Sequence, residues 1–214
     1  MSTDTALPPA LERNWWLRAL AVLVAPRAVF ASLRDDSDEA AEQRQDPLSA
    51  IAALAGISVV LVSPTFRRML NDGSVSLGLV PALAFISGSL YAVAVYWLGG
   101  GLLYGAARRF GSEGGWRRAR QLLALAATPL ALSLLTFWPL RIAVYGEDLF
   151  RTGGDDYGRG DAAFGGVYLG LVAWSVWLLL VGVRTVHGWT WARSVATVGV
   201  AAAFPALIVL AASL

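Results

Sequence analysis

The stretch GVRTVHGWTWARS, residues 182–194, carries the only histidine of the chain, His187, beside a glycine and among aromatic and basic side chains. Imidazole is a frequent general base and metal ligand, so this residue raises the question of an active site. A zinc site needs several converging ligands, however, and the sequence has no cysteine, no second histidine and no HExxH pattern. We therefore predict no catalytic residue and no metal site, and we interpret the stretch as a cytoplasmic turn between two apolar runs. The other side chains that mark this turn are Arg184, Trp189, Trp191 and Arg193.

A second group of chemically distinctive residues lies between positions 108 and 120. It contains five arginines and one tryptophan, namely Arg108, Arg109, Trp116, Arg117, Arg118 and Arg120. Arginines beside a bilayer attract anionic lipid by about 1 kcal/mol each. Membrane topology by itself also requires positive charge in a loop on the cytoplasmic side. The cluster is our candidate for lipid or partner contact, and both explanations of it stay open.

A third polar region is YGEDLFRTGGDDYGRGDAAFGG, residues 145–166, which is rich in glycine. Its five carboxylates are Glu147, Asp148, Asp155, Asp156 and Asp161. Hard cations such as Ca²⁺ prefer clustered carboxylates in a flexible loop. The spacing fits no EF-hand, so we favour a solvated loop on the outer face and keep a cation site as the alternative.

The elements that must position these loops are strongly apolar. The chain has 214 residues, of which 57% are hydrophobic and 15% charged, whereas a soluble domain carries about a quarter of its residues as charges. The charges are also segregated, and they leave five runs long enough to cross a bilayer. We predict an all-α membrane protein, with an N-terminal segment over 1–47 and a membrane domain over 48–214. Its five-helix bundle has spans at about 48–65, 77–104, 121–140, 164–183 and 194–213.

The placement of basic residues predicts the orientation. All 17 are arginine. The N-terminal segment, the second loop and the fourth loop together carry 12 of them, and the first and third loops carry the other 5. By the positive-inside rule the N-terminus is cytoplasmic, and after five spans the C-terminus faces away from the cytoplasm. The predicted location is the cell membrane.

The N-terminal segment is predicted to contain short amphipathic helices. Trp15, Trp16, Leu20 and Leu23 fall on one helical face with Arg18 beside it. Tryptophan and arginine on a short amphipathic helix suit the headgroup region of a bilayer. Packing of this segment against the membrane domain is the equally weighted alternative.

The five predicted spans themselves offer little chemistry. They contain no Asp, Glu, His or Arg, the residues on which proton and ion relays depend, which argues against coupled transport. The small-residue pairs Gly101–Gly105 and Gly166–Gly170 permit close helix approach, although such pairs also recur by chance. Pro129 lacks a backbone donor and predicts a structural kink in the third span. No concentrated basic stripe on a soluble domain indicates nucleic-acid binding.

Three stretches resemble the YIP family, the Ypt/Rab-interacting polytopic membrane proteins, and in particular its prokaryotic members. APRAVFASLRDD (25–36) is similar to the proline–aromatic segment before the family's first span. GGWRRARQLLALAATPLALSLL (114–135) resembles its third span, and VRTVHGWTWARSVATV (183–198) resembles its link from the fourth span to the fifth. The likeness covers most of residues 15–214. It implies a cytoplasmic N-terminus and an external C-terminus.

The resemblance also bears on function. Eukaryotic relatives bind prenylated Rab-type GTPases, but a shared fold does not imply a shared function, so this role is not transferred. We expect a non-enzymatic membrane organising or adaptor protein that uses no cofactor and acts through membrane lipids, anionic ones included, and a membrane or cytoplasmic protein partner. Whether it forms a homo-oligomer is left open. The alternative is a permease-like or channel-like component, alone or as a subunit of a larger complex.

Overall fold

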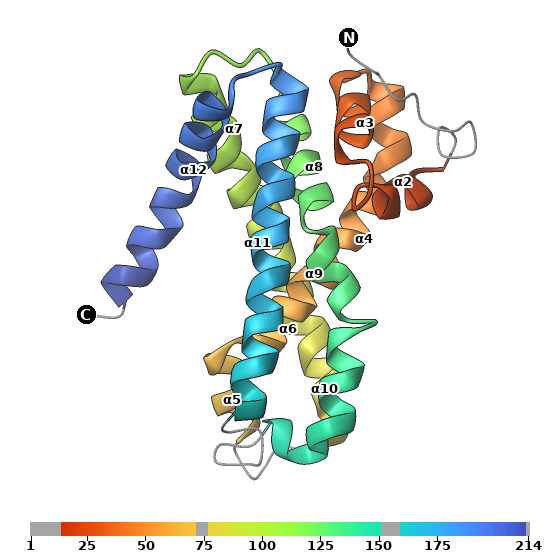
Figure 1. Cartoon of the computed structure of the whole chain (residues 1–214), viewed down its shortest axis with the longest axis vertical. Helices are drawn as coiled ribbons and strands as arrows, with labels where there is room; N and C mark the ends of the chain where they lie inside the picture. The colour runs from red at the N-terminus through yellow and green to blue at the C-terminus, as the bar shows by residue number, and fades with distance from the viewer. Residues whose placement is uncertain (1–13, 72–76, 151–158, 213–214) are drawn as a thin grey trace. The chain divides into compact units, whose positions relative to one another are not determined.

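The computed structural model describes residues 14–71, 77–150 and 159–212, and within these ranges the regular elements are helices and no strand occurs (Figure 1). In chain order, the first elements are α2 (Trp15–Ala21), α3 (Pro26–Ala31), η1 (Ser32–Arg34), α4 (Asp38–Val62), α5 (Pro64–Leu70), η2 (Leu77–Leu79), α6 (Val80–Ala94) and the π-helix η3 (Val95–Gly99). They are followed by α7 (Gly100–Arg109), α8 (Trp116–Ala126), α9 (Thr128–Ser133), α10 (Phe137–Tyr145), η4 (Gly146–Phe150), α11 (Arg159–His187) and α12 (Trp191–Ala212).

Four helical stretches are long and apolar enough to cross a membrane: Asp38–Val62, Val80–Arg109, Trp116–Tyr145 and Gly160–His187. They confirm a multi-pass helical membrane protein and account for the first four predicted spans. For the fifth, the apolar stretch over the described side chains is Trp191–Leu207. This stretch is shorter than the roughly 20 residues that cross the hydrocarbon core, so a fifth span stays a prediction.

The first spanning helix begins well before the apolar run that predicted it. The polar stretch DEAAEQRQD opens α4 at Asp38, ten residues before the expected start of the span. Ser37 caps this start, because its Oγ accepts the Ala40 N–H at 3.4 Å. The Asp35 carboxylate in turn accepts the Ser37 N–H at 3.0 Å, and hydrogen bonds from Ser37 lower the pKa of Asp35. The carboxylate is therefore held ionised next to the positive end of the helix dipole.

The third span is interrupted rather than continuous. Helix α8 ends at Ala126, and α9 begins at Thr128 with Pro129 in its first turn. A proline in the first turn loses no helical hydrogen bond, because the N–H at that position has no partner within the helix. The Leu130 N–H instead closes a turn on the Ala127 carbonyl at 3.0 Å. The predicted kink at Pro129 thus lies at a boundary between two helices.

The helices group into two compact units. The first unit comprises Met1–Ser49, Ala94–Ala126 and Val176–Leu214, and the second comprises Ala50–Val93 and Ala127–Ser175. In the first unit, α7 packs against both α8 and α12. The ring of Phe30 on α3 packs against Gly182 of α11, where an added Cβ would lie 2.8 Å from it.

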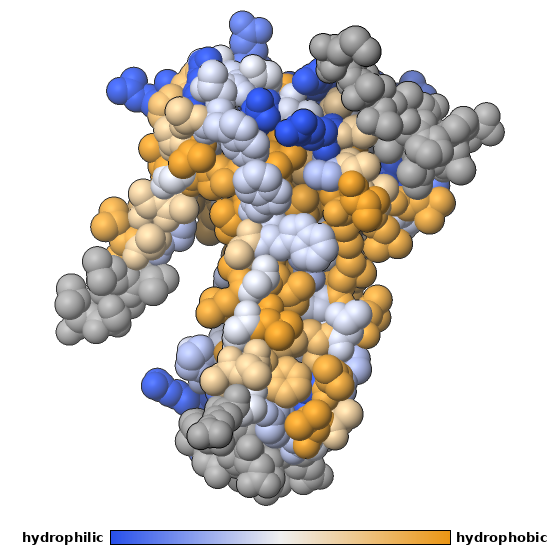
Figure 2. Space-filling view, in the orientation of Figure 1, coloured by the Kyte–Doolittle hydropathy of each residue, from blue (hydrophilic) through white to orange (hydrophobic). Residues whose placement is uncertain are grey.

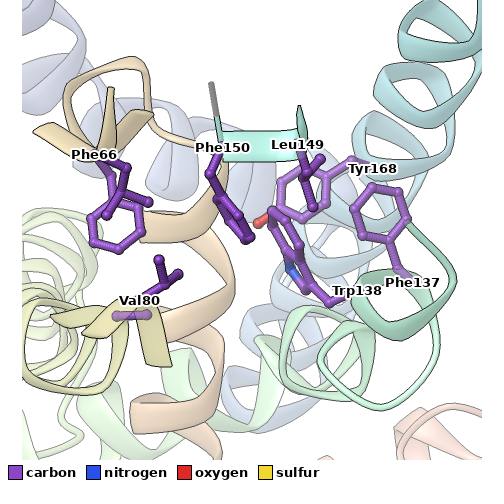
Figure 3. Packing of buried hydrophobic residues seen from close by; sticks show 9 residues of the cluster. Phe66, Val80, Phe137, Trp138, Leu149, Phe150 and Tyr168 are labelled. Atoms are coloured by element: carbon purple, nitrogen blue, oxygen red, sulfur yellow. The ribbon is translucent and has the colours of Figure 1, made fainter. Parts of the chain in front are cut away.

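The second unit is built around an aromatic core. Figure 3 shows Phe137, Trp138 and Tyr168 gathered together, with Phe150 of η4 and Phe66 of α5 also contributing rings. The centre of the Phe137 ring lies 5.5 Å from that of Trp138 and 5.4 Å from that of Tyr168. Both distances are within the range of favourable aromatic pairs. The outer side of α10 is apolar as well, as Figure 2 shows in orange, and the exposed residues there are Leu140, Ile142 and Val144. Exposed apolar residues on a spanning helix suit contact with lipid chains.

A close helix crossing joins α4 and α6 in the second unit. A Cβ on Gly56 would lie 2.4 Å from the Gly88 carbonyl oxygen, and a Cβ on Gly88 would lie 2.4 Å from Cα of Ile57. Only glycine permits backbones this close. The glycine pairs that the sequence suggested do not serve this purpose. Beyond the nearby backbone of their own helix, Gly105, Gly166 and Gly170 have no atom within 4 Å of an added Cβ, and Gly101 meets the Trp116 ring at ordinary contact distance. Spacing alone does not say which glycine faces a neighbouring helix.

Candidate functional site

Charged side chains of the first unit converge on one hydrogen-bonded group, here called the arginine–aspartate network. It connects the segment between α3 and α4 with α4, α8 and the end of α11. Its members are Arg34, Asp35, Asp36, Asp38, Arg44, Arg117, Arg118 and Gln121.

Arg44 is the buried centre of the network. Its side chain is 0% exposed; Nε donates to Gln121 Oε1 at 2.6 Å and Nη1 donates to the Asp35 carbonyl at 2.8 Å. Gln121 Nε2 donates in turn to the Ala41 carbonyl at 3.3 Å. The Asp36 carboxylate lies 3.7 Å from Arg44 Nη2. Burying a charge is costly unless it is paired and hydrogen-bonded, so these partners are what allow Arg44 to sit inside the unit.

Two residues of the predicted lipid-contact cluster belong to this network. Arg117 donates to the Asp38 carboxylate at 2.7 Å and to the Asp36 carbonyl at 2.9 Å. Arg118 donates to the Arg34 carbonyl at 2.9 Å and lies 3.4 Å from the Asp36 carboxylate. Any lipid phosphate at these two guanidinium groups therefore competes with intramolecular partners.

The remaining arginines of the cluster have different surroundings. Arg108 and Arg109 are exposed at the end of α7; Arg108 makes a long 3.5 Å hydrogen bond to the Ser112 carbonyl and lies 6.0 Å from the centre of the Tyr104 ring. Arg120 lies among aromatic rings, with its guanidinium carbon 3.8 Å from the centre of the Trp97 ring and 5.4 Å from that of Trp116. The structure thus divides five similar arginines into paired, exposed and ring-covered groups.

The turn around His187 is ordered by stacking. His187 is the last residue of α11, and Gly188 follows with a φ of +66°, a left-handed conformation that glycine adopts at little cost. The His187 ring stacks on Trp189 with a centroid distance of 4.4 Å, and its Nδ1 lies 3.3 Å from Ser112 Oγ. Arg193 covers Trp189 from 4.3 Å and donates to the Phe110 carbonyl.

The other two predicted residues of this turn are also engaged. Arg184 lies over the Trp191 ring at 4.7 Å, and Trp191 stacks on Trp177 at 5.1 Å. Beside His187 there is a cavity of only about 10 Å³, lined in part by Ser112, Arg118 and Val183. A cavity of that size holds about one water molecule. The described residues around His187 therefore form a packed turn with no room for a substrate.

In the second unit, Ser58 of α4 is the node of a buried hydroxyl cluster. Trp138 Nε1 donates to Ser58 Oγ at 3.1 Å, and the Tyr168 hydroxyl lies 3.2 Å from the same oxygen. Ser58 Oγ is also 2.5 Å from Ser133 Oγ, which donates to the Leu130 carbonyl. If Tyr168 donates to Ser58 and Ser58 donates to Ser133, every donor of the cluster is satisfied. This assignment makes the cluster a structural tie among α4, α9, α10 and α11.

The acidic third region is described only in part. Its Asp161 pairs with Arg141 of α10, whose Nη2 donates to the carboxylate at 2.6 Å. Asp155 and Asp156, together with the side chains of Glu147 and Asp148, lie outside the described residues. Among the side chains that are described, no group of three or more His, Cys, Asp or Glu residues could hold a metal ion.

Replacing Asp36 with asparagine is expected to loosen the segment before α4. The change removes the negative charge that Arg44, Arg117 and Arg118 share, at a cost of about 2 kcal/mol. Hydrogen exchange of residues 32–40 should accelerate by roughly thirtyfold, since each 1.4 kcal/mol is one factor of ten. Glu42→Gln is the matched control, because Glu42 is exposed and the same charge is lost. Equal exchange in the two variants would show that the network does not hold this segment.

Six members of the network escaped the sequence analysis, namely Arg34, Asp35, Asp36, Asp38, Arg44 and Gln121. Arg44 and Gln121 stand at the edges of apolar runs, where each is indistinguishable from a solvated flanking residue. Asp36 belongs to an acidic stretch that reads as a connector. The sequence does show that residues 35–38 are acidic and residues 117–120 are basic. It does not show that these two segments, about 80 residues apart in the chain, lie side by side in the fold.

The long apolar helices with a polar network and a packed aromatic turn define a multi-pass integral membrane protein. The family model described as the Yip1 domain matches residues 20–214. The chain therefore belongs to the Yip1 domain family, and the predicted membership is confirmed. Comparisons with the curated proteins and with the solved structures gave no significant match.

Proposed function

We propose that this protein is a non-enzymatic membrane organiser or adaptor that acts through contacts with lipids and with a protein partner. In this proposal it crosses the plasma membrane of a bacterial cell five times, with α12 as the fifth span. The N-terminus is cytoplasmic and the C-terminus lies on the other side. The division of arginines, 12 against 5, supports this orientation, and the exclusive use of arginine is typical of a GC-rich genome.

The observation that carries the proposal is that α2 is packed against the first unit on one side and exposes apolar residues on the other. Trp15 is buried and its ring faces the guanidinium groups of Arg18 and Arg44, at 4.7 and 5.9 Å. On the same short helix Trp16 and Leu20 are about half exposed, at 54% and 49%. Trp16 and Leu20 each follow a buried residue, Trp15 and Ala19, so α2 presents an apolar surface on its exposed side. The contact of the Trp15 ring with Arg44 joins this helix to the arginine–aspartate network. An apolar face with tryptophan and arginine suits contact with a membrane surface or a membrane partner.

A photoreactive amino acid at position 17 tests this proposal. Leu17 is exposed on α2, and Val29 on α3 is fully buried and serves as the control. After irradiation of the full chain in native membranes, we expect cross-links from position 17 to lipid and to one reproducible protein, and none from position 29. The same weak background from both positions would contradict the proposal.

A cavity in the second unit favours the alternative of a permease-like or channel-like component. It measures about 610 Å³ and is lined by apolar residues of α4, α6, α10 and η4. Among them are Leu61, Ala84, Trp138 and Phe150. Flux of a solute into proteoliposomes that is abolished by Ala84→Trp, which fills the cavity, would support this alternative over the adaptor.

A further inference from the structure

We propose that Arg120 and the rings around it form a binding site for the phosphate of an anionic membrane phospholipid. This inference rests on the proposed lipid contacts and narrows them from a cluster of five arginines to one built site in the first unit. It is carried by the surroundings of the guanidinium group, by its lack of a counter-charge, and by the exposure of the rings.

Aromatic rings cover the guanidinium group of Arg120. Its carbon atom lies 3.8 Å from the centre of the Trp97 ring, 5.2 Å from Tyr96 and 5.4 Å from Trp116. Trp97 and Trp116 meet edge to face at 5.4 Å, so the two rings also hold each other in place. Rings over the face of a guanidinium group leave its edge, where the N–H donors lie, for an in-plane ligand.

The positive charge of Arg120 has no anionic partner among the described residues. Its Nε is buried without a hydrogen bond, and none of the ion pairs or hydrogen bonds of the first unit reaches its terminal nitrogens. Arg117, one turn earlier on α8, has two carboxylates within 4 Å. Because no carboxylate neutralises the charge of this half-buried arginine, the site favours the arrival of an anion.

The backbone is shaped for this arrangement. Tyr96 and Trp97 belong to the π-helix η3, and π-turns within α-helices occur frequently at functional sites. Gly100 follows, and a Cβ there would lie 2.3 Å from Cγ of Arg120. The absence of that side chain is what lets the Arg120 stem cross α7 and place its guanidinium over Trp97.

The exposure of the rings points to a lipid headgroup. Trp97 and Trp116 are 45% and 44% exposed, and both lie on helices long and apolar enough to cross a membrane. Exposed tryptophans on such helices concentrate at the level of the headgroups. A guanidinium edge donates two parallel hydrogen bonds to a phosphate. A headgroup with net negative charge is favoured over a zwitterionic one, because the charge of Arg120 is not otherwise neutralised.

Lipid-dependent thermal unfolding of the full chain in nanodiscs tests the site. Adding phosphatidylglycerol to phosphatidylcholine nanodiscs should raise the Tm of the wild type. In Arg120→Gln most of this rise should disappear, as expected for about fivefold weaker binding when one arginine contact is lost. Arg120→Lys should keep part of the rise, because an ammonium retains the charge but not the paired donors. Arg109→Gln removes the same charge from an exposed position and should keep the full rise.

Four results would overturn the proposal. A full rise in Arg120→Gln would mean that Arg120 does not bind the lipid. An equal loss in Arg109→Gln would mean that only net charge matters. A Tm lowered by the same amount with and without phosphatidylglycerol would mean that Arg120 is purely structural. An equal rise on adding inorganic phosphate to phosphatidylcholine nanodiscs would assign the site to a free anion.

A second variant keeps the test decisive if Arg120→Gln does not fold. Trp116→Leu removes one exposed ring and leaves the guanidinium group, and it should reduce the phosphatidylglycerol-dependent rise; an unchanged rise counts against the site. The cross-links from position 17 on α2 do not involve Arg120. They would persist if this site fails and would vanish only if the proposed function fails.

Discussion

Gly88→Ala is expected to destabilise the second unit by about 3 kcal/mol, which is the largest loss of stability among the substitutions predicted for this chain. The new Cβ would lie 2.4 Å from Cα of Ile57 and 2.8 Å from its backbone nitrogen. Backbone atoms cannot rotate away as a side chain can, so α4 and α6 must move apart. That movement also separates Gly56 from the Gly88 carbonyl and opens the packing between the two helices. The measurement is the thermal unfolding midpoint of the purified protein in a mild detergent.

Gly166→Ala is the matched control for this prediction. Gly166 lies in α11 with nothing within 4 Å of an added Cβ. Alanine there should be neutral or stabilising by up to about 1 kcal/mol, because it restricts the unfolded backbone and favours the helix. Similar unfolding midpoints for the two variants would show that the α4–α6 crossing is not as close as described.

Ser58→Ala is expected to give the second-largest loss, about 2 kcal/mol or more. The change removes one oxygen atom but leaves two buried donors, Trp138 Nε1 and the Tyr168 hydroxyl, without their acceptor. Ser133 would lose a partner at the same time. An unsatisfied group inside an apolar unit costs more than the hydrogen bond is worth, so the effect exceeds that of a single bond.

The directions of the hydrogen bonds can be tested by ranking three variants. Tyr168→Phe removes a donor together with its own proton and leaves Ser58 bonded to Trp138 and Ser133, so it should cost less than Ser58→Ala. Ser87→Ala is the control, since Ser87 Oγ bonds only to the Leu83 carbonyl of its own helix, at 2.5 Å. The unfolding midpoint should be highest for Ser87→Ala, intermediate for Tyr168→Phe and lowest for Ser58→Ala. A Ser58→Ala midpoint equal to that of Ser87→Ala would contradict the tie.

Charge segregation is local information, and the predictions that depend on it succeeded best. Uncharged runs near 48–66 and 162–183 indicate spanning helices whatever their neighbours are, because lipid requires every backbone group to be satisfied within the helix. The same reasoning missed that α4 begins at Asp38. The apolar run marks the part of a helix that faces lipid, whereas Ser37 and the arginine–aspartate network determine where the helix begins.

Predictions that depend on which face of a helix meets a neighbour were weaker. Gly166 and Gly170 have the spacing of a packing motif but meet no neighbouring helix, whereas Gly56 and Gly88 have no glycine four residues away and pack together. Trp15 and Trp16 were predicted to share one helical face, but Trp15 is buried and Trp16 is exposed. Adjacent positions on a helix differ by about 100°, so small shifts in the orientation of a helix separate them.

The residue types and their order by themselves determined that this is a multi-pass helical membrane protein of the Yip1 domain family. Hydrophobic length and family motifs are properties of contiguous segments, and segments are what a sequence displays. Only the tertiary structure decided that Arg117 and Arg118 pair with aspartates while Arg120 lies among Tyr96, Trp97 and Trp116. The physical reason is that electrostatic and packing energies depend on distances of a few ångströms between residues far apart in the chain. Five arginines of identical chemistry therefore acquire different roles only when the fold assigns their neighbours.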